Sequence, residues 1–400
     1  MITIFEKCLA FTDAEEARGE GLYPFFLPIG KNEGTKVYID GAEMVMFGSN
    51  NYLDLANDER VKEAARKAIG LYGTSCSGSR FMNGTLELHE ELEKRLATFI
   101  HKEAALCFTT GYQTNLGSLS AIVGSGDHLV VDKYDHASIM DGVFMALGMK
   151  KGINLHRFRH NDTADLEQIL QKIPFEAGKI IVVDGVFSME GDITPLKEIR
   201  SLADKYNAAI YLDEAHAIGV LGATGRGTCE YFGGDYALSD ITMCTFSKSF
   251  GSIGGFVAGD AKVIDYIKHM ARPLIFSASM PPANIAAVIK ALEIIEEEPQ
   301  RVARLRYNGD LLRQKLQGAG FDTGESETPI IPLVVGDNEK TFMMWKGAFE
   351  RGLYVNPVIS PAVPPHRSLL RISCMATHSE EQIEFAFSVL KEWGGKLGLI

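Results

Sequence analysis

Short apolar runs alternate with longer amphipathic stretches between residues 100 and 260 of this 400-residue chain. Seven such runs have the length and the polar or glycine-containing boundaries that are typical of buried β-strands. They span residues 104–108, 128–131, 155–158, 179–183, 208–212, 241–245 and 255–258. Stretches long enough for crossover helices separate most of them. This alternation predicts an α/β fold with a mainly parallel seven-stranded sheet that is covered by helices on both faces.

The two ends of the chain carry other patterns. Residues 1–45 predict an N-terminal arm with a small strand pair that turns at Gly41. After residue 282 a long helical region at 283–317 is followed by strands at 330–334 and 369–373, a helix at 339–350 and a final helix opened by a capping box at 379–382. We therefore expect an arm at 1–45, a large domain at 46–284 and a smaller C-terminal α+β domain at 285–400.

Composition limits the classes of function. The net charge of -12 argues against a nucleic-acid partner, because phosphate backbones require clustered lysine and arginine. The 6 cysteines form no C-x-x-C pair, which argues against a zinc site or a disulfide framework and favours a cytoplasmic protein. The acidic residues 13–16 do not fit a secretory signal, and no apolar run approaches the roughly 18 residues of a spanning helix. Any membrane contact is expected to be peripheral.

Lys248 lies among hydroxyl groups and glycines in segment 245–255, directly after the apolar run 241–244. Burial disfavours the ammonium form, and the neutral amine that results can form a Schiff base with an aldehyde such as pyridoxal phosphate. Thr245 and Ser247 are suitable hydrogen-bond partners for a phosphate, and the glycines allow the backbone to approach a ligand. A solvated loop lysine is the alternative, so the rest of the sequence must supply the partners of this residue.

Asp213 and His216 follow the predicted strand 208–212 at its carboxyl end, where ligands collect in parallel sheets. An aspartate at a pyridine nitrogen keeps that nitrogen protonated and makes the ring an electron sink. The alternative is a helix-capping aspartate beside a structural histidine, and D-E-A-H alone favours it. Lys248 follows the next predicted strand, and the presence of both motifs at neighbouring strand ends favours the cofactor interpretation.

Three further segments carry candidate chemistry. Gly111 and Tyr112 lie between a strand and a helix, where backbone amides form an anion site, although Thr110 as an ordinary helix cap is an equal alternative. His136 follows strand 128–131 and is placed to stack on a ring, or is structural. Arg371 lies in an apolar run, which is costly unless the guanidinium is paired, either with a substrate carboxylate or in an internal salt bridge.

Taken together, T-F-S-K-S-x-G-x-x-G-G at 245–255, D-E-A-H at 213–216, T-G-Y at 110–112, D-H-A-S at 135–138 and S-M-E-G-D at 188–192 resemble the α-oxoamine synthases over essentially the whole chain. These are fold-type I pyridoxal-phosphate enzymes that condense an amino acid with an acyl-CoA and release CoA and CO₂. Segments 78–85, 158–161, 272–279 and 352–356 most resemble the members that use L-serine and a long-chain acyl-CoA.

The resemblance implies a role for each matching residue. Lys248 would carry the Schiff base, His136 would stack on the ring, Asp213 would contact the pyridine nitrogen and His216 the phenolate oxygen. Gly111, Tyr112, Thr245, Ser247 and, from the second subunit of a homodimer, Ser277 would hold the phosphate of pyridoxal 5'-phosphate, and Asn51 and Arg371 would bind the substrate carboxylate. No metal is expected.

The implied reaction joins L-serine to palmitoyl-CoA and gives 3-ketodihydrosphingosine, CoA and CO₂. Two residues depart from the pattern of the family: Ile359 stands where some of its members carry an arginine, and Asp184 where many carry a glutamate. A synthase of the same family that uses glycine or alanine is the alternative. An alternative of another class is a catalytically silent partner subunit or a cofactor-binding regulator.

Overall fold

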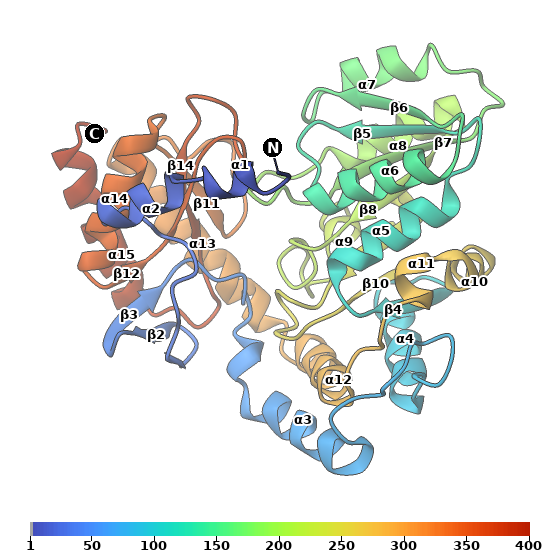
Figure 1. Cartoon of the computed structure of the whole chain (residues 1–400), viewed down its shortest axis with the longest axis horizontal. Coiled ribbons are helices and arrows are strands. Elements are labelled where there is room, and N and C mark those ends of the chain that lie inside the picture. Colours follow the sequence, from blue (N-terminus) through green and yellow to red (C-terminus); the bar gives the residue numbers. More distant parts are fainter. Residues whose placement is uncertain (1–2) are drawn as a thin grey trace.

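The computed structural model describes residues 3–400 and contains a central seven-stranded sheet (Figure 1). Its strand order is β4-β10-β9-β8-β7-β5-β6, in which β5 to β9 are parallel and β10 runs antiparallel to both of its neighbours. The strands are β4 (Ala104–Phe108), β5 (His128–Asp132), β6 (Asn154–Phe158), β7 (Lys179–Asp184), β8 (Ala209–Asp213), β9 (Ile241–Thr245) and β10 (Gly255–Gly259). The predicted α/β fold and its mainly parallel sheet are confirmed.

Helices cover both faces of this sheet, which explains why its strands read as continuous apolar runs. In β7, Ile180 and Val182 point into a core formed with α5 (Gly111–Ile122), α6 (Ala137–Met149) and α10 (Ala261–Met270). Ile181 and Val183 point the other way, into a core formed with α7 (Thr163–Leu170) and α8 (Leu196–Tyr206). Each such side chain contributes about 1.5–3 kcal/mol when fully buried.

A third layer joins the sheet to the C-terminal part of the chain. Here α3 (Glu59–Tyr72), α4 (Glu87–Phe99) and α12 (Pro282–Glu297) contribute to one large apolar core. The long helical region expected at 283–317 is interrupted, because α12 ends at Glu297 and α13 (Gln300–Gly318) begins after Pro299. Proline lacks the amide hydrogen that a continuous helix would need at that position.

The C-terminal part contains a three-stranded antiparallel sheet in the order β11-β14-β13. Its strands are β11 (Ile330–Val334), β13 (Asn356–Val358) and β14 (Leu369–Ser373), and α13, α14 (Asn338–Glu350) and α15 (Glu380–Lys396) accompany them. The predicted capping box is present: Ser379 Oγ accepts from the Gln382 amide at 3.2 Å, and Gln382 Oε1 accepts from the Ser379 amide at 3.1 Å. This sheet carries Arg371 in β14.

The N-terminal arm forms the predicted hairpin but also pairs with a distant strand. The turn between β2 (Lys36–Ile39) and β3 (Ala42–Met46) has positive φ at Asp40 and Gly41, as tight hairpin turns require. Beyond it, β3 pairs in parallel with β12 (Leu353–Tyr354). In Figure 1 the blue hairpin accordingly lies beside the orange and red C-terminal elements.

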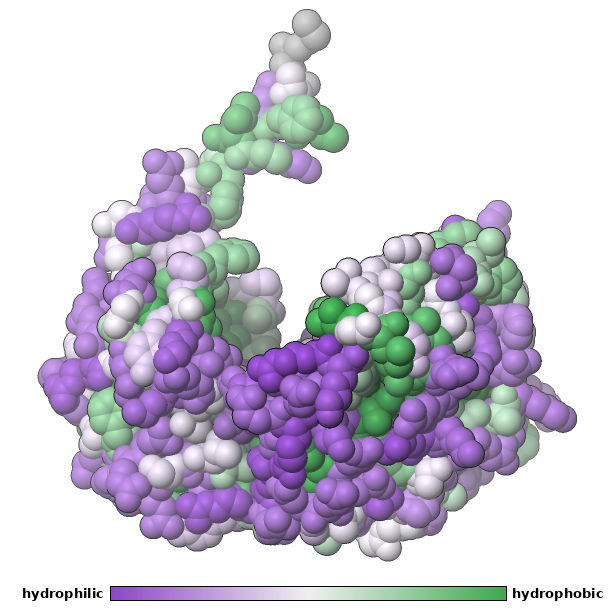
Figure 2. Space-filling view, turned by 90° about the horizontal axis from the view of Figure 1, so that it is seen from below, coloured by the Kyte–Doolittle hydropathy of each residue, from purple (hydrophilic) through white to green (hydrophobic). Residues whose placement is uncertain are grey.

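The first helices of the arm, α1 (Glu6–Leu9) and α2 (Asp13–Gly19), have no buried residues. Figure 2 shows the end of the arm standing away from the rest of the molecule, with many hydrophobic residues on it. Within residues 3–400 no helix is long and apolar enough to cross a membrane. The remaining short elements are β1 (Lys31–Asn32), η1 (Leu55–Asn57), α9 (Thr228–Tyr231), η2 (Tyr236–Leu238) and α11 (Arg272–Ile275).

Candidate active site

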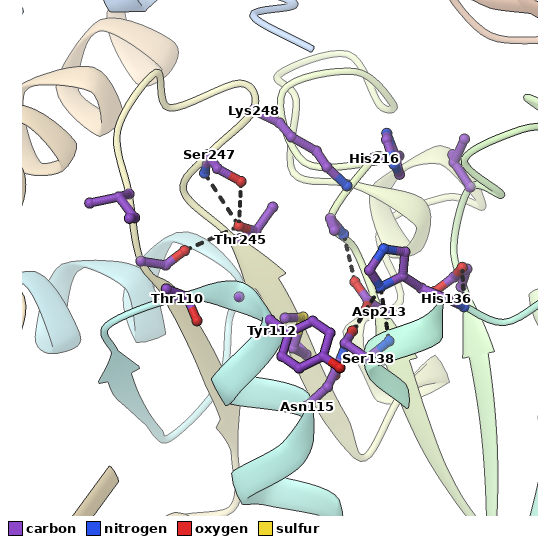
Figure 3. Close-up of a pocket in the computed structure, with 17 residues that line it drawn as sticks. Thr110, Tyr112, Asn115, His136, Ser138, Asp213, His216, Thr245, Ser247 and Lys248 are labelled. Carbon is purple, nitrogen blue, oxygen red and sulfur yellow. Dashed lines mark hydrogen bonds between the residues drawn. The ribbon is translucent and has the colours of Figure 1, made fainter. Parts of the chain in front are cut away.

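A pocket of about 320 Å³ lies at the carboxyl ends of β7, β8 and β9, next to the N-terminal ends of α5 and α6 (Figure 3). Parallel strands end at one edge of a sheet, so their following loops meet there. The pocket is lined by Thr110, Gly111, Tyr112, Asn115, His136, Ser138, Asp184, Val186, Asp213, Ala215, His216, Met243, Thr245, Ser247, Lys248, Ile253 and Gly254. It therefore gathers eight of the eleven residues that the sequence predicts for the site.

Lys248 extends from the loop after β9 toward His216 and Asp213 (Figure 3). Burial lowers the pKa of its ammonium from 10.5 to about 8, although the carboxylates of Asp213 and Asp184 act in the opposite direction. A substantial fraction of this amine is therefore neutral near pH 8. The neutral form is the one that reacts with an aldehyde or removes a proton.

Asp213 ends β8 and is almost fully buried, with 3% of its surface exposed. Its Oδ2 accepts from Asn115 Nδ2 at 2.8 Å, and its Oδ1 accepts from the Ala215 amide at 2.9 Å. No cationic side chain within residues 3–400 forms an ion pair with it. A buried carboxylate without a positive partner is costly. A protonated ring nitrogen bound in the pocket would supply that charge.

His136 begins α6 and is fixed at two points. Its Nδ1 lies 2.8 Å from Ser138 Oγ, and its backbone amide donates to Asp184 Oδ2 at 3.2 Å. Burial in the pocket lowers the pKa of His136, an effect that Asp213 partly opposes. Because the ring is mainly neutral at pH 7, it is suited to stacking on a flat ligand rather than to binding an anion.

The anion-binding end of the pocket lies where α5 begins. Thr110 caps the helix, since its Oγ1 accepts from the Gln113 amide at 3.1 Å, while no acceptor in the described residues bonds the amides of Gly111 and Tyr112. A Cβ added to Gly111 would lie 2.6 Å from both Cβ and Oγ1 of Thr245, so only glycine permits this approach. The amides and these hydroxyls form a cradle that fits a phosphate.

The hydroxyls opposite this helix are organised by β9 and the loop that follows it. Thr245 Oγ1 lies 2.9 Å from Ser247 Oγ and donates to the Gly254 carbonyl at 3.1 Å. The side chain of Tyr112, in contrast, is 45% exposed and bonds Asp141 at the pocket rim. Of this residue, the backbone amide is the part that faces the cradle.

His216 is buried beside the pocket, and burial together with the nearby cations Lys248 and Arg371 lowers its pKa well below the usual range. Its Nδ1 lies 2.7 Å from the hydroxyl of Tyr52, which also accepts from Arg371 Nη2 at 3.3 Å. The tyrosine proton has two neighbouring acceptors, His216 Nδ1 at 2.7 Å and Asn50 Oδ1 at 3.3 Å, and the shorter contact favours Nδ1. We therefore assign the ring proton of His216 to Nε2.

Arg371 is 5% exposed and forms no ion pair with any carboxylate of residues 3–400. Its guanidinium bonds three neutral groups instead: the Ser188 carbonyl at 2.6 Å, Ser373 Oγ at 2.9 Å and the Tyr52 hydroxyl. The alternative of an internal salt bridge is therefore wrong. The positive charge remains without a counter-ion, which suits a ligand carboxylate.

Two predicted residues lie outside the pocket lining along with Arg371. Asn51 borders a neighbouring cavity of about 220 Å³, where its amide nitrogen donates to Asp54 at 2.9 Å and its oxygen accepts from the Ala56 amide at 3.3 Å. Ser277 follows α11 and accepts from Gln113 Nε2 at 3.1 Å. The structure therefore does not bring these two side chains to Lys248 within one chain.

Sequence reasoning missed Asn115, Ser138 and Tyr52 as site residues. Asn115 lies one helical turn after Gly111, so the spacing of four residues could have placed both on one face of α5. Ser138 stands two residues after His136 in the quoted D-H-A-S motif. Tyr52 carries no such local signal, because its contacts with His216 and Arg371 span 164 and 319 residues.

Comparisons with known proteins agree with this arrangement. The family described as aminotransferase class I and II matches residues 42–390. Serine palmitoyltransferase of Sphingobacterium spiritivorum is 49% identical over 381 residues, which cover 95% of this chain and 94% of that protein. A serine palmitoyltransferase structure from S. paucimobilis with bound PLP–myriocin aldimine has a TM-score of 0.93 at 34% identity, covering 99% and 98% of the two chains.

A relative with another name is also similar to this chain. The 8-amino-7-oxononanoate synthase of Thermosipho melanesiensis is 38% identical over 397 residues, which cover 99% of this chain and 100% of that protein. The relatives therefore differ in the reaction that they are named for, while sharing the length and the family.

Proposed function

Since the chain belongs to the aminotransferase class I and II family, we propose that it binds pyridoxal phosphate at Lys248 and condenses L-serine with a long-chain acyl-CoA such as palmitoyl-CoA. The products are 3-ketodihydrosphingosine, CoA and CO₂. One observation carries the proposal: a lysine with a pKa of about 8 shares its pocket with a buried aspartate that forms no ion pair within residues 3–400. When bound there, pyridoxal phosphate supplies an electron sink for the α-carbon of the amino acid.

The pocket residues fit this cofactor from the phosphate to the ring. The amides of Gly111 and Tyr112 would hold the phosphate, together with the hydroxyls of Thr245 and Ser247. At the other end, three side chains would contact the ring. Asp213 would keep its nitrogen protonated, neutral His136 would stack on its face, and His216 would donate from Nε2 to its phenolate oxygen.

Lys248 would also act as the base of the reaction. With the cofactor and serine bound, its Nζ would remove the proton from Cα of serine. A pKa of about 8 suits this task, because the amine can accept a proton near neutral pH and return it later in the reaction.

Arg371 would bind the serine carboxylate. Its guanidinium is held by three neutral acceptors and has no counter-ion within residues 3–400, so an incoming carboxylate adds the missing charge without displacing an internal ion pair. Asn51, the second proposed ligand, would exchange its bond to Asp54 for one to the substrate. The proposal therefore requires the Asn51 side chain to move from the neighbouring cavity toward the pocket of Lys248.

A second cavity, of about 650 Å³, would receive the acyl-CoA. It shares His136 with the lysine pocket and is lined on one side by Tyr134, Ser188 and Met189. The segment 360–365, which carries three prolines, forms another side, and Lys133 offers a cation for an anionic group. Its position beside the pocket supports delivery of the thioester to Cα of serine.

The active enzyme is proposed to be a homodimer. Three large apolar side chains are exposed: Phe81 by 56%, Met82 by 78% and Phe276 by 74%. The segments that carry them are neighbours, because the Ser279 amide donates to the Gly78 carbonyl at 2.9 Å. Such exposed apolar side chains favour contact with a second copy. Ser277, the residue after Phe276, would complete the phosphate site of the partner subunit. Sedimentation velocity measures the mass directly, and a monomer at working concentration contradicts this part of the proposal.

A cytoplasmic location, with peripheral contact to the membrane that receives a lipid product, completes the proposal. Fractionation of expressing cells at low and high ionic strength tests it. A peripheral protein is released from membranes by salt, whereas a purely cytoplasmic one stays in the supernatant throughout.

The competing functions differ in measurable ways. A synthase acting on glycine or alanine, such as 2-amino-3-ketobutyrate CoA ligase or 8-amino-7-oxononanoate synthase, would share the pocket but respond to another amino acid. A silent partner subunit or regulator would release no CoA. The presence of Lys248, Asp213, His136 and His216 in one pocket argues against silence, because a silent copy does not need that set.

A CoA-release assay over a matrix of amino acids and acyl-CoA lengths tests the proposal on the purified protein. Serine with a long-chain acyl-CoA is expected to give the highest kcat/KM, and serine alone is expected to change the visible spectrum of the bound cofactor. A preference for glycine or alanine in both measurements would support the related synthases instead.

A further inference from the structure

His160 lies just beyond β6 and joins two carboxylates. Its Nδ1 lies 3.0 Å from Asp132 Oδ1, and its Nε2 lies 2.8 Å from Asp192 Oδ2. Both ring nitrogens must carry protons to make both bonds. Burial opposes that charge, but the two carboxylates outweigh burial and raise the pKa of His160 to about 10. The ring is an imidazolium clamped between two strand-end loops.

Aromatic rings hold the clamp from the sides. The ring of Tyr134 stacks on His160 with centroids 4.5 Å apart, and the ring of Phe187 meets it edge-on at 4.4 Å. Asn161 adds a second link, because its amide donates to Asp132 at 2.8 Å and its side chain to Asp192 at 3.1 Å. The imidazolium is therefore confined in position and orientation.

Asp192 closes a tight turn at 187–191. The Phe187 amide donates to the Asp192 carbonyl at 3.1 Å, and the Gly191 amide donates to the Phe187 carbonyl at 2.9 Å. The same turn presents the Ser188 carbonyl to Arg371 Nε at 2.6 Å. One short segment thus connects the clamp on the large sheet to the arginine on the small sheet.

The turn has its second support in the C-terminal part of the chain. Thr328 Oγ1 donates to the Gly191 carbonyl at 2.9 Å, and a Cβ at Gly191 would lie 2.3 Å from the Ile330 carbonyl oxygen. Without the imidazolium, the link from Asp192 to Asp132 through His160 is lost, and on the side of the large sheet the bonds of the Asn161 side chain to Asp192 and to the Ile193 carbonyl remain. The Ser188 carbonyl of the turn could then move away from the guanidinium.

We infer that His160 is a positioning residue for Arg371: it fixes Asp192, and through it the turn whose Ser188 carbonyl aims the guanidinium at the amino-acid site. His160 itself does not line the pocket of Lys248. This inference rests on the proposed function, in which Arg371 binds the carboxylate of the amino acid. It therefore concerns the affinity for the amino acid and not the chemistry at Lys248.

Two variants of the holoenzyme test the inference. His160→Gln keeps a side chain of similar size that can no longer bridge both carboxylates with two charged bonds, and Asp192→Asn keeps the shape but removes the charge. We expect the KM for L-serine, and the dissociation constant of serine from the spectral change, each to rise about tenfold. The affinity for pyridoxal phosphate and the cofactor spectrum without serine are expected to stay as in the parent protein, because His160 and Asp192 do not line the pocket of Lys248.

His156→Gln is the matched control. His156 lies on β6, just before His160 in the chain, and its side chain bonds His128 at 2.9 Å and not Asp192. Its constants for serine are expected to be unchanged. A double variant of His160→Gln with Arg371→Lys should lose less serine affinity than the sum of the two single losses, since one residue acts through the other.

Three outcomes overturn the inference: unchanged serine affinity in both variants, whatever their Tm; equal losses of affinity for serine and for pyridoxal phosphate; and fully additive losses in the double variant. A parent protein that shows no spectral or kinetic response to serine instead contradicts the proposed function. The two failures are therefore distinguishable in one set of measurements.

Discussion

The hydroxyl of Tyr52 lies 2.7 Å from His216 Nδ1 and accepts a hydrogen bond from Arg371 Nη2 at 3.3 Å. One fully buried phenol therefore connects the proposed cofactor-binding histidine to the proposed substrate-binding arginine. His216 receives its tautomer and Arg371 receives part of its orientation from the same oxygen. The two proposed binding functions are thus physically linked before any ligand enters.

Replacing Tyr52 with phenylalanine should impair both functions while preserving the fold. The expected KM for L-serine rises about tenfold, because Arg371 loses an acceptor, and stability falls by about 1–3 kcal/mol, because a buried ring nitrogen loses its partner. Steady-state kinetics and urea unfolding measure the two effects. Tyr206→Phe is the control. It removes a hydroxyl on α8 that donates to Glu167 of α7 at 2.9 Å, and it is expected to leave the serine kinetics unchanged. Equal kinetics in both variants would refute the role of Tyr52.

Lys248→Ala should abolish turnover and the visible absorbance of the bound cofactor. The substitution removes both the covalent anchor and the proposed base, so we expect a fall in kcat of at least about 10²–10⁴-fold. CoA release and absorbance spectra of the purified variant provide the measurement. Lys172→Ala, at an exposed lysine, is the control and should behave as the parent protein. Substantial activity in the Lys248 variant would contradict the mechanism.

The pKa of Lys248 predicts how the apoenzyme takes up its cofactor. Only the neutral amine attacks the aldehyde, so the rate of uptake should rise about tenfold per pH unit below pH 8 and level off above it. Rapid-mixing absorbance at a series of pH values gives the midpoint. A midpoint near 10.5, the ordinary value for lysine, would show that the pocket does not perturb this amine.

The same shift sets the sign of a stability effect in the apoenzyme. The pKa of Lys248 is lower in the folded chain than in the unfolded chain, so the unfolded chain binds more protons between about pH 8 and 10.5. The contribution of this residue to the free energy of unfolding should therefore increase with pH across that window. Lys248→Met removes the charge, and the difference in stability between variant and parent should shrink as the pH rises.

Gly111→Ala should disrupt the phosphate cradle. The added Cβ would lie 2.6 Å from the Cβ of Thr245. That Cβ is attached directly to the backbone of β9, so the start of α5 has to shift. We expect the affinity for pyridoxal phosphate to fall about tenfold or more and stability to fall by about 1–3 kcal/mol. Equilibrium dialysis and thermal unfolding of the apoenzyme measure these changes.

Gly148→Ala is the matched control for this substitution. Gly148 lies near the end of α6, and no atom comes within 4 Å of its added Cβ. Alanine should be neutral there, or stabilise the helix by up to about 1 kcal/mol. A loss of cofactor affinity as large as that of Gly111→Ala would show that the cradle has no special steric requirement.

The sequence by itself determined the sheet and the chemistry at its edge. Buried strands such as β7 are unbroken apolar runs in the sequence. The polar residues that follow parallel strands meet at one edge of the sheet, so the sequence predicts that Asp213 and Lys248 lie close together, as they do in the pocket. These signals are local, because a few consecutive residues determine where a strand begins and ends, whether it is buried and where the next loop starts. The break between α12 and α13 at Pro299 was also local and should have been predicted.

Only the tertiary structure decided the contacts between distant segments. The links from Tyr52 to His216 and Arg371, from His160 to Asp192, and from β3 to β12 depend on how the two sheets are packed. The position of Asn51, in a neighbouring cavity, depends on it too. No periodicity records these pairs, since each joins residues whose surroundings are fixed by long-range packing of the chain and not by their neighbours in sequence.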